Sequence, residues 1–181
     1  MQINIEIKGG DDMKEKLEQA INFLKGGDIL EIIGVEAINH FKQSFEDEGF
    51  TDKSLDKWDT RKSKRLTRNE QKTLSDTGEL AESIDYRVEG NTVIIYSDKP
   101  YAQIHNEGGE ITVTPKMRSF FIAKHYEAKE AGNTEAQDMW QAMFFSDKIT
   151  IPKRQFIGDS EMLNVKIKDK ITRELDNIFK S

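Results

Sequence analysis

Apolar residues recur every three or four positions in three long stretches of the chain, and this spacing predicts three amphipathic helices. The first helix covers residues 11–25, the second residues 28–48 and the third residues 160–179. Gly26-Gly27 predicts a left-handed end for the first helix, and Gly49 marks the end of the second. The second helix has the most regular spacing of the three.

Shorter stretches alternate between apolar and polar residues, which is the pattern of half-buried strands. Residues 2–8 form one such stretch. Residues 84–88 and 93–96 flank a glycine-containing turn and predict a β-hairpin. Residues 111–114 and 148–151 predict two further strands, which pair with each other although they are far apart in the sequence.

The 33 residues between these last two strands, 115–147, form two weakly helical patterns separated by Gly132-Asn133. They predict a helical arm inserted into a hairpin. Because helices and strands do not alternate regularly, the fold class is α+β rather than a doubly wound sheet. We therefore expect one domain over residues 1–181, with a small antiparallel sheet packed against two or three helices.

Composition narrows the functional classes. No apolar run approaches the 18 residues of a transmembrane helix, and the N-terminus lacks the pattern of a secretory signal, so neither is expected. The chain has no Cys, which excludes disulfides, thiolate nucleophiles and Cys-based zinc sites. Its net charge of −6 argues against a surface uniformly adapted to nucleic acid.

The charge is concentrated unevenly. Residues 51–73 carry a net charge of +4, so the remainder of the chain carries −10. This basic loop lacks apolar periodicity and predicts an exposed, mobile segment that includes Trp58. Two interpretations stay open: a merely solvated loop, or a contact with nucleic acid or an acidic partner, with Trp58 stacked on a base. The cations available for such a contact are Arg61, Lys62, Lys64, Arg65, Arg68 and Lys72.

Candidate catalytic chemistry is sparse. His105 lies close to Asn106 and Glu107, but the cysteines of a zinc deaminase are absent, and no second metal-binding histidine has a suitable spacing. No phosphate-binding glycine loop and no G-x-S-x-G nucleophile elbow occurs. We therefore expect a non-enzyme without a cofactor. A metal-dependent nuclease that uses His105 and Glu107 is kept as an alternative hypothesis.

Four short motifs follow one another in a recognisable order. They are Phe45–Gly49 leading to Lys57-Trp58, LSDTGELAESI at 74–84, YAQIHNEGG at 101–109 and IPKRQFIG at 151–158. In this order they resemble the phage virion morphogenesis family, the tail-completion or neck proteins of Mu-like and related tailed phages. The departures are Gln155, where the family pattern has Pro, and residues 1–25, which look like an addition. The residues that carry the resemblance are Trp58, Thr77, Gly78, Leu80, Ser83, Ile84, Tyr101, Ala102, His105, Gly108, Pro152, Arg154 and Phe156.

The resemblance implies a structural protein of the virion, assembled in the bacterial host cytoplasm, that acts at the end of the tail or at the head–tail junction. Its expected partners are other tail or connector proteins and further copies of itself in a ring. A DNA contact through the basic loop is the alternative that the charge of residues 51–73 leaves open. The motif residues are expected to hold the fold. Tyr101 would pack on the sheet, Arg154 would pair with a carboxylate, and Phe156 would fill the core beneath the last helix.

Overall fold

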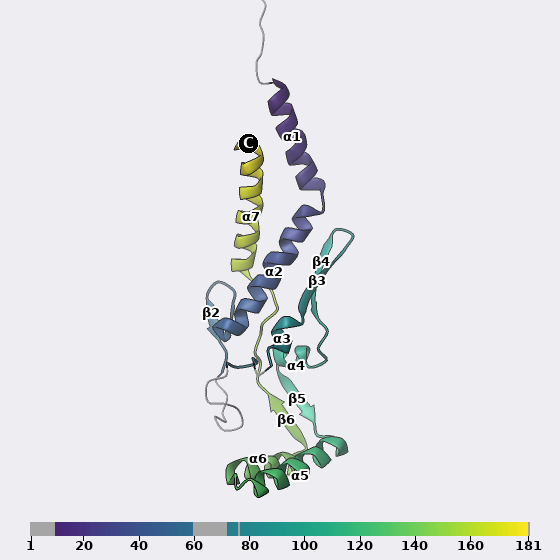
Figure 1. Ribbon diagram of the computed structural model, residues 1–181, viewed down its shortest axis with the longest axis vertical. Helices are drawn as coiled ribbons and strands as arrows, with labels where there is room; N and C mark the ends of the chain where they lie inside the picture. The colour runs from purple at the N-terminus through teal and green to yellow at the C-terminus, as the bar shows by residue number, and fades with distance from the viewer. Residues whose placement is uncertain (1–9, 60–71, 76, 181) are drawn as a thin grey trace, which may run out of the picture.

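A computed structural model describes residues 10–59, 72–75 and 77–180 of the chain. The described part is elongated (Figure 1). A layer of long helices forms one end, and a two-stranded arm ending in a helix pair forms the other. We call these parts the body and the arm. The predicted strand at residues 2–8 lies outside the described residues.

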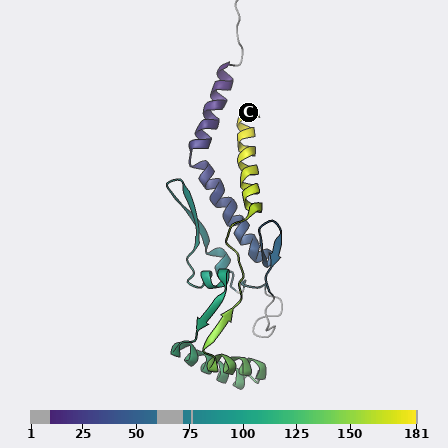
Figure 2. The same ribbon diagram turned by 180° about the vertical axis from the view of Figure 1, so that it is seen from behind.

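The body is built on the three helices that the apolar spacing predicts: α1 (Gly10–Lys25), α2 (Asp28–Asp47) and α7 (Glu161–Lys180). Figures 1 and 2 show α7 running beside α2 and on toward α1. The left-handed stop predicted at Gly26-Gly27 is wrong, because Gly27 is right-handed and α2 begins immediately after it. The left-handed residue that ends α2 is Glu48, one position before the predicted glycine.

The strands confirm an α+β fold, but they form three separate antiparallel pairs in the described ranges rather than one small sheet. The second pair is the predicted hairpin. The third is the predicted long-range pair, although its first strand ends two residues early because the side chain of Thr114 caps the next helix. The pairs are β1 (Gly49–Thr51) with β2 (Leu55–Lys57), β3 (Ile84–Glu89) with β4 (Thr92–Ser97), and β5 (Gly109–Thr112) with β6 (Lys148–Ile151).

The arm confirms the predicted helical insertion. Strands β5 and β6 carry α5 (Pro115–Glu130) and α6 (Thr134–Phe145) to the end of the molecule remote from α1 (Figure 1). Gly132 makes the turn between the two helices with a φ of 67°. The side chain of Asn133 then accepts a hydrogen bond from the backbone of Ala136 and caps α6.

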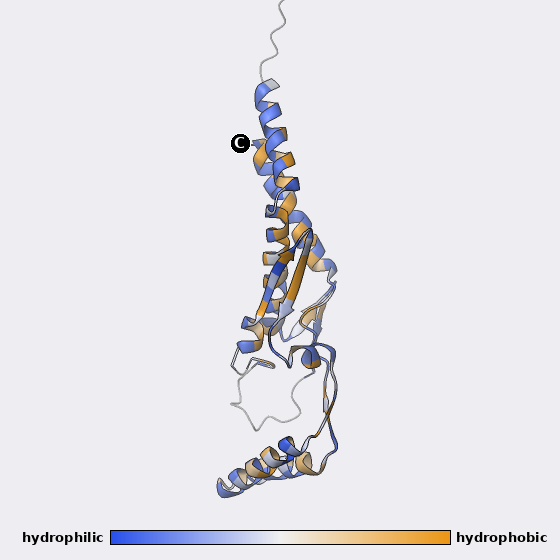
Figure 3. Cartoon of the chain, turned by 90° about the vertical axis from the view of Figure 1, so that its right-hand side faces the viewer, coloured by the Kyte–Doolittle hydropathy of each residue, from blue (hydrophilic) through white to orange (hydrophobic). Residues whose placement is uncertain are grey.

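The hydrophobic core lies where the body meets the arm. It is formed by the C-terminal half of α2, the start of α7 and the short helices α3 (Glu79–Glu82) and α4 (Ala102–Glu107). Its largest fully buried side chains are Phe45, Phe156 and Ile84. Apolar residues are not confined to this core, since Figure 3 shows them on the arm helices as well. Among the described residues, no helix combines the length and apolarity that crossing a bilayer requires.

Candidate functional site

The four motifs, which are distant in the sequence, meet at the base of the arm. Figure 1 shows α3 and α4 beside the first residues of β5, and the chain that follows β6 passes the same place on its way to α7. We call this region the motif junction. The core residues Trp58, Leu80, Ala102 and Phe156 represent one motif each.

Trp58 is buried, so the prediction of an exposed tryptophan in a mobile loop is wrong. Its ring lies edge-to-face against Phe45 with centroids 5.6 Å apart, and its Nε1–H donates a 2.8 Å hydrogen bond to the carbonyl of Gln155. A satisfied indole in the core cannot stack on a base. The hairpin β1–β2 delivers Trp58 to this place, and sequence periodicity missed that hairpin because each strand has only three residues.

Phe156 fills the core beneath the start of α7, as predicted, with its ring centroid 5.1 Å from that of Phe45. Its backbone is held by Asn106, which the sequence reasoning did not select. The Asn106 Oδ1 accepts hydrogen bonds from the N–H groups of Phe156 and Ile157, both at 2.9 Å. Its Nδ2 donates to the carbonyl of Ile157 at 3.1 Å. One amide therefore fastens the third motif to the fourth.

Backbone contacts complete this connection. The N–H of Arg154 donates to the carbonyl of His105 at 2.8 Å. Gly108 has a φ of 73°, and a Cβ at this position would lie 2.7 Å from the backbone nitrogen of Lys153, so the close approach requires glycine. The buried side chain of Arg154 donates from Nη2 to the carbonyl of Asp59 at 3.3 Å. The predicted carboxylate partner of Arg154 stays a prediction.

The second motif forms the turn into α3. The Thr77 hydroxyl accepts a 3.4 Å hydrogen bond from the N–H of Glu79, and Gly78 has the left-handed φ of 75° that a tight entry needs. Ser83 then donates to the carbonyl of Leu80 at 2.8 Å. The buried side chain of Leu80 belongs to the core, as does that of Ile84, the first residue of β3. This motif therefore has a structural role.

Three further motif residues lie at the surface or near it. Tyr101 is exposed, and its ring stands edge-to-face against that of His105 with centroids 6.0 Å apart. Pro152 is exposed directly after β6. Burial is the main cause that lowers the pKa of His105, and the charge of Arg154 lowers it further, so both favour the neutral imidazole.

The geometry offers little for catalysis. In the described ranges, no group of three or more His, Asp or Glu residues could hold a metal ion. The Glu107 carboxylate accepts from Gln103 Nε2 at 3.2 Å, while the His105 ring faces Tyr101. The buried histidine His40 bonds through Nε2 to the carbonyl of Thr51 at 2.9 Å and has a pKa lowered mainly by burial.

The candidate nucleic-acid contact falls mostly outside the described residues. Lys72 is described, and its ammonium pairs with the carboxylate of Glu46 on α2. The contact through the basic loop therefore stays a prediction. The cations that lie outside the described ranges are Arg61, Lys62, Lys64, Arg65 and Arg68.

Comparison with known proteins agrees with the arrangement of the motifs. The model of the phage virion morphogenesis family matches residues 28–176, which include the whole motif junction and the arm. The chain belongs to this family. This virion morphogenesis protein is thus associated with the assembly of phage particles. No curated protein and no solved structure matches the chain.

The family match begins at the first residue of α2, so α1 precedes the matched region. This agrees with the interpretation of residues 1–25 as an addition. In the virion morphogenesis protein, the motif residues mostly fasten the arm to the body, and the large exposed apolar side chains lie mainly on α1, α7 and the arm helices.

Proposed function

We propose that this protein is a tail-completion or head–tail neck component that assembles into a ring in the virion, without catalysis. In this role it is assembled in the cytoplasm of the bacterial host. Membership of the virion morphogenesis family supports the setting. The structural observation that carries the proposal is an apolar stripe on α1 that the fold leaves uncovered. It consists of Met13, Leu17, Ile21 and Leu24, each 45–53% exposed.

The size of this stripe favours an assembly surface. Burying one such side chain completely contributes about 1.5–3 kcal/mol, so covering the exposed half of four contributes about 3–6 kcal/mol per copy. Isolated apolar residues are common on protein surfaces, whereas a contiguous row of them marks an interaction site. The residues recur at three- and four-residue spacing along one face of α1, and the opposite face is polar.

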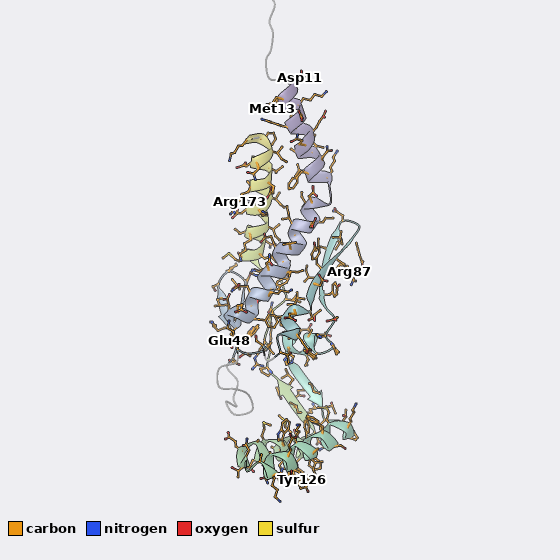
Figure 4. All side chains as sticks on the ribbon, in the orientation of Figure 1. Asp11, Met13, Glu48, Arg87, Tyr126 and Arg173 are labelled. Carbon is orange, nitrogen blue, oxygen red and sulfur yellow. The ribbon has the colours of Figure 1, made fainter. Side chains whose placement is uncertain are left out.

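The shape of the chain supports a ring. In Figure 4 the labelled Met13 on α1 and Tyr126 on the arm lie at opposite ends of the molecule. If copies pack laterally with their long axes parallel, α1 of one copy lies beside the body of the next, and the arm lies beside the next arm. Different surfaces of neighbouring copies then meet, and such heterologous contacts close into a ring when the rotation between copies allows it.

The test is to inactivate the gene in a phage that produces this protein and to image the particles. We expect unjoined heads and tails, or tails with unfinished ends, and restoration of complete particles when the protein is supplied separately. Supplying a Leu17→Glu variant should fail to restore them, whereas Val88→Glu, which changes an exposed residue on β3, should succeed. Complete infectious particles in the absence of the protein would refute the proposal.

A further inference from the structure

The helix pair of the arm has two different apolar edges. Phe120, Phe121 and Ile122 are consecutive in α5, and only the middle one is buried, stacked at 6.0 Å on Trp140 of α6. Phe120 is 51% exposed and Ile122 is 38% exposed. Because successive residues of an α-helix are rotated by about 100°, Phe120 and Ile122 leave α5 on opposite sides of the buried face.

The Ile122 edge contains a hollow. Its cavity volume is about 110 Å³, and its walls come from both helices. Phe145 in its wall is 70% exposed, which is unusual for a phenylalanine, and its ring stands edge-to-face against that of Phe144 with centroids 5.0 Å apart. Figure 4 shows the labelled Tyr126 at the extreme end of the arm. The hollow is lined by Ile122, His125, Tyr126, Gln141, Phe144 and Phe145.

The Phe120 edge carries a projecting ring that is already held in position. The Phe120 ring stands edge-to-face against Trp140 with centroids 5.9 Å apart, and the Lys124 ammonium lies 6.0 Å from its centre. A ring that is fixed before association loses little rotational freedom on binding, which favours affinity. Aromatic side chains of this kind dominate the energetics of protein interfaces.

We propose that Phe120 of one copy inserts into the hollow of the next copy, so that the arm helices form a continuous belt around the ring. This proposal rests on the proposed ring assembly. An apolar cavity of about 150 Å³ holds a benzene molecule, so an open hollow of about 110 Å³ admits most of a phenyl ring.

The occupant is a second copy because the projecting ring and the hollow belong to opposite edges of the same unit. A contact between two unlike edges leaves the growing oligomer with one free projecting ring at one end and one free hollow at the other. Addition of copies therefore continues until the ring closes. A contact between two like edges would instead stop at a dimer.

The weakness of the helix pair on its own supports the same conclusion. In the described ranges, its buried apolar side chains are only Phe121, Ala128 and Ala136, and α5 and α6 together with their connection span residues 115–145. A unit of this size buries too little apolar surface to be stable in isolation. Packing against the helix pair of a neighbour supplies the missing apolar contacts.

Cysteine cross-linking tests the contact directly, because the natural chain has no Cys. Lys124→Cys places a thiol beside the projecting ring, and Gln141→Cys places one in the wall of the hollow. Under oxidation the double variant should give a ladder of cross-linked oligomers, and each single variant should remain uncross-linked. Dimers from a single variant, or rings of the double variant without cross-links, would overturn the proposal.

Light scattering and negative-stain imaging of the full chain provide the second test. Phe120→Ser should weaken association at least about 30-fold, the loss typical of a hot-spot side chain. Phe179→Ser, which changes an exposed residue of α7, should not weaken it. A monomeric natural chain at every concentration would refute the ring and this contact together. Rings of Phe120→Ser that match the natural chain would refute the contact alone.

Mixing two variants guards against an effect of misfolding. Phe120→Ser keeps the hollow, and Tyr126→Ser keeps the projecting ring. Each variant alone should associate weakly, and a mixture should form heterodimers in a 1:1 ratio through the single intact pair of edges. Failure of the mixture to form more dimer than either variant alone would contradict the proposed pairing.

Discussion

Removing the Asn106 side chain tests whether this amide fastens the arm to the body. Asn106→Ala deletes three hydrogen bonds and leaves two N–H groups and one carbonyl of residues 156–157 without that partner. A hydrogen bond contributes about 0.5–1.5 kcal/mol net, and a buried group left unsatisfied costs about 1–3 kcal/mol. Because these three groups are only partly buried, we take the lower end of the second range, about 1 kcal/mol, for each of them. The expected loss in the free energy of unfolding is about 3 kcal/mol.

Urea denaturation followed by circular dichroism measures this loss. The melting temperature should fall by about 6–12 °C, since 1 kcal/mol corresponds to about 2–4 °C for a protein of this length. All variants are compared at one protein concentration, because self-association would stabilise the folded state. Asn164→Ala is the matched control, because Asn164 is exposed on α7, and its replacement should change stability by less than about 0.5 kcal/mol. A change for Asn106→Ala as small as that of the control would refute the reasoning.

Three further variants test the packing and the electrostatics. Gly34→Ala should destabilise the fold by about 1–3 kcal/mol in urea denaturation, because its Cβ would lie 2.3 Å from the Tyr86 ring, whereas Gly10→Ala has open space and should not destabilise it. Trp58→Phe should cost about 1–3 kcal/mol in the same assay, because the carbonyl that accepts from the indole loses its donor. His40→Gln should reduce the loss of stability between pH 7 and pH 5. The folded-state pKa of His40 is lowered, so the unfolded chain binds the proton first as the pH falls through about 6.5, and folding loses free energy there until the folded pKa is reached. A pH profile of stability unchanged by His40→Gln would contradict the lowered pKa of His40. Unchanged stability of Gly34→Ala or Trp58→Phe would contradict the packing described for those residues.

Sequence periodicity predicted the helices, the hairpin and the arm because each of these is determined mostly by its own residues. These signals depend on residues only a few positions apart in the sequence. They are the apolar stripes of α1, α2 and α7, the turn at Gly90 and the break at Gly132. The left-handed end assigned to Gly26-Gly27 failed for a related reason. The chain passes from one helix directly into another there, so no reversal is needed, and Gly27 stays right-handed.

The contacts that assemble the motif junction could not be predicted in the same way. Asn106 acts on residues about 50 positions away, and Trp58 on a carbonyl 97 positions away. The strand pair β1–β2 has no alternating pattern, and its position is explained by long-range contacts such as the packing of Trp58 against Phe45 and the hydrogen bond of His40 to the carbonyl of Thr51. A resemblance to family motifs identified the right segments, but it did not show which atoms join them.

The motif junction and the exposed apolar surfaces should respond differently to substitution. Asn106 and Gly108 fix the arm to the body, so their replacement should lower stability first and assembly only as a consequence. Leu17 and Phe120 contribute little to the core because they are about half exposed, so their replacement should lower assembly and leave the melting temperature of the monomer nearly unchanged. The family match excludes α1 but includes the arm. If the matched region contains the shared means of assembly, the arm contact closes the ring, and the stripe on α1 adds a contact particular to chains with this N-terminal helix.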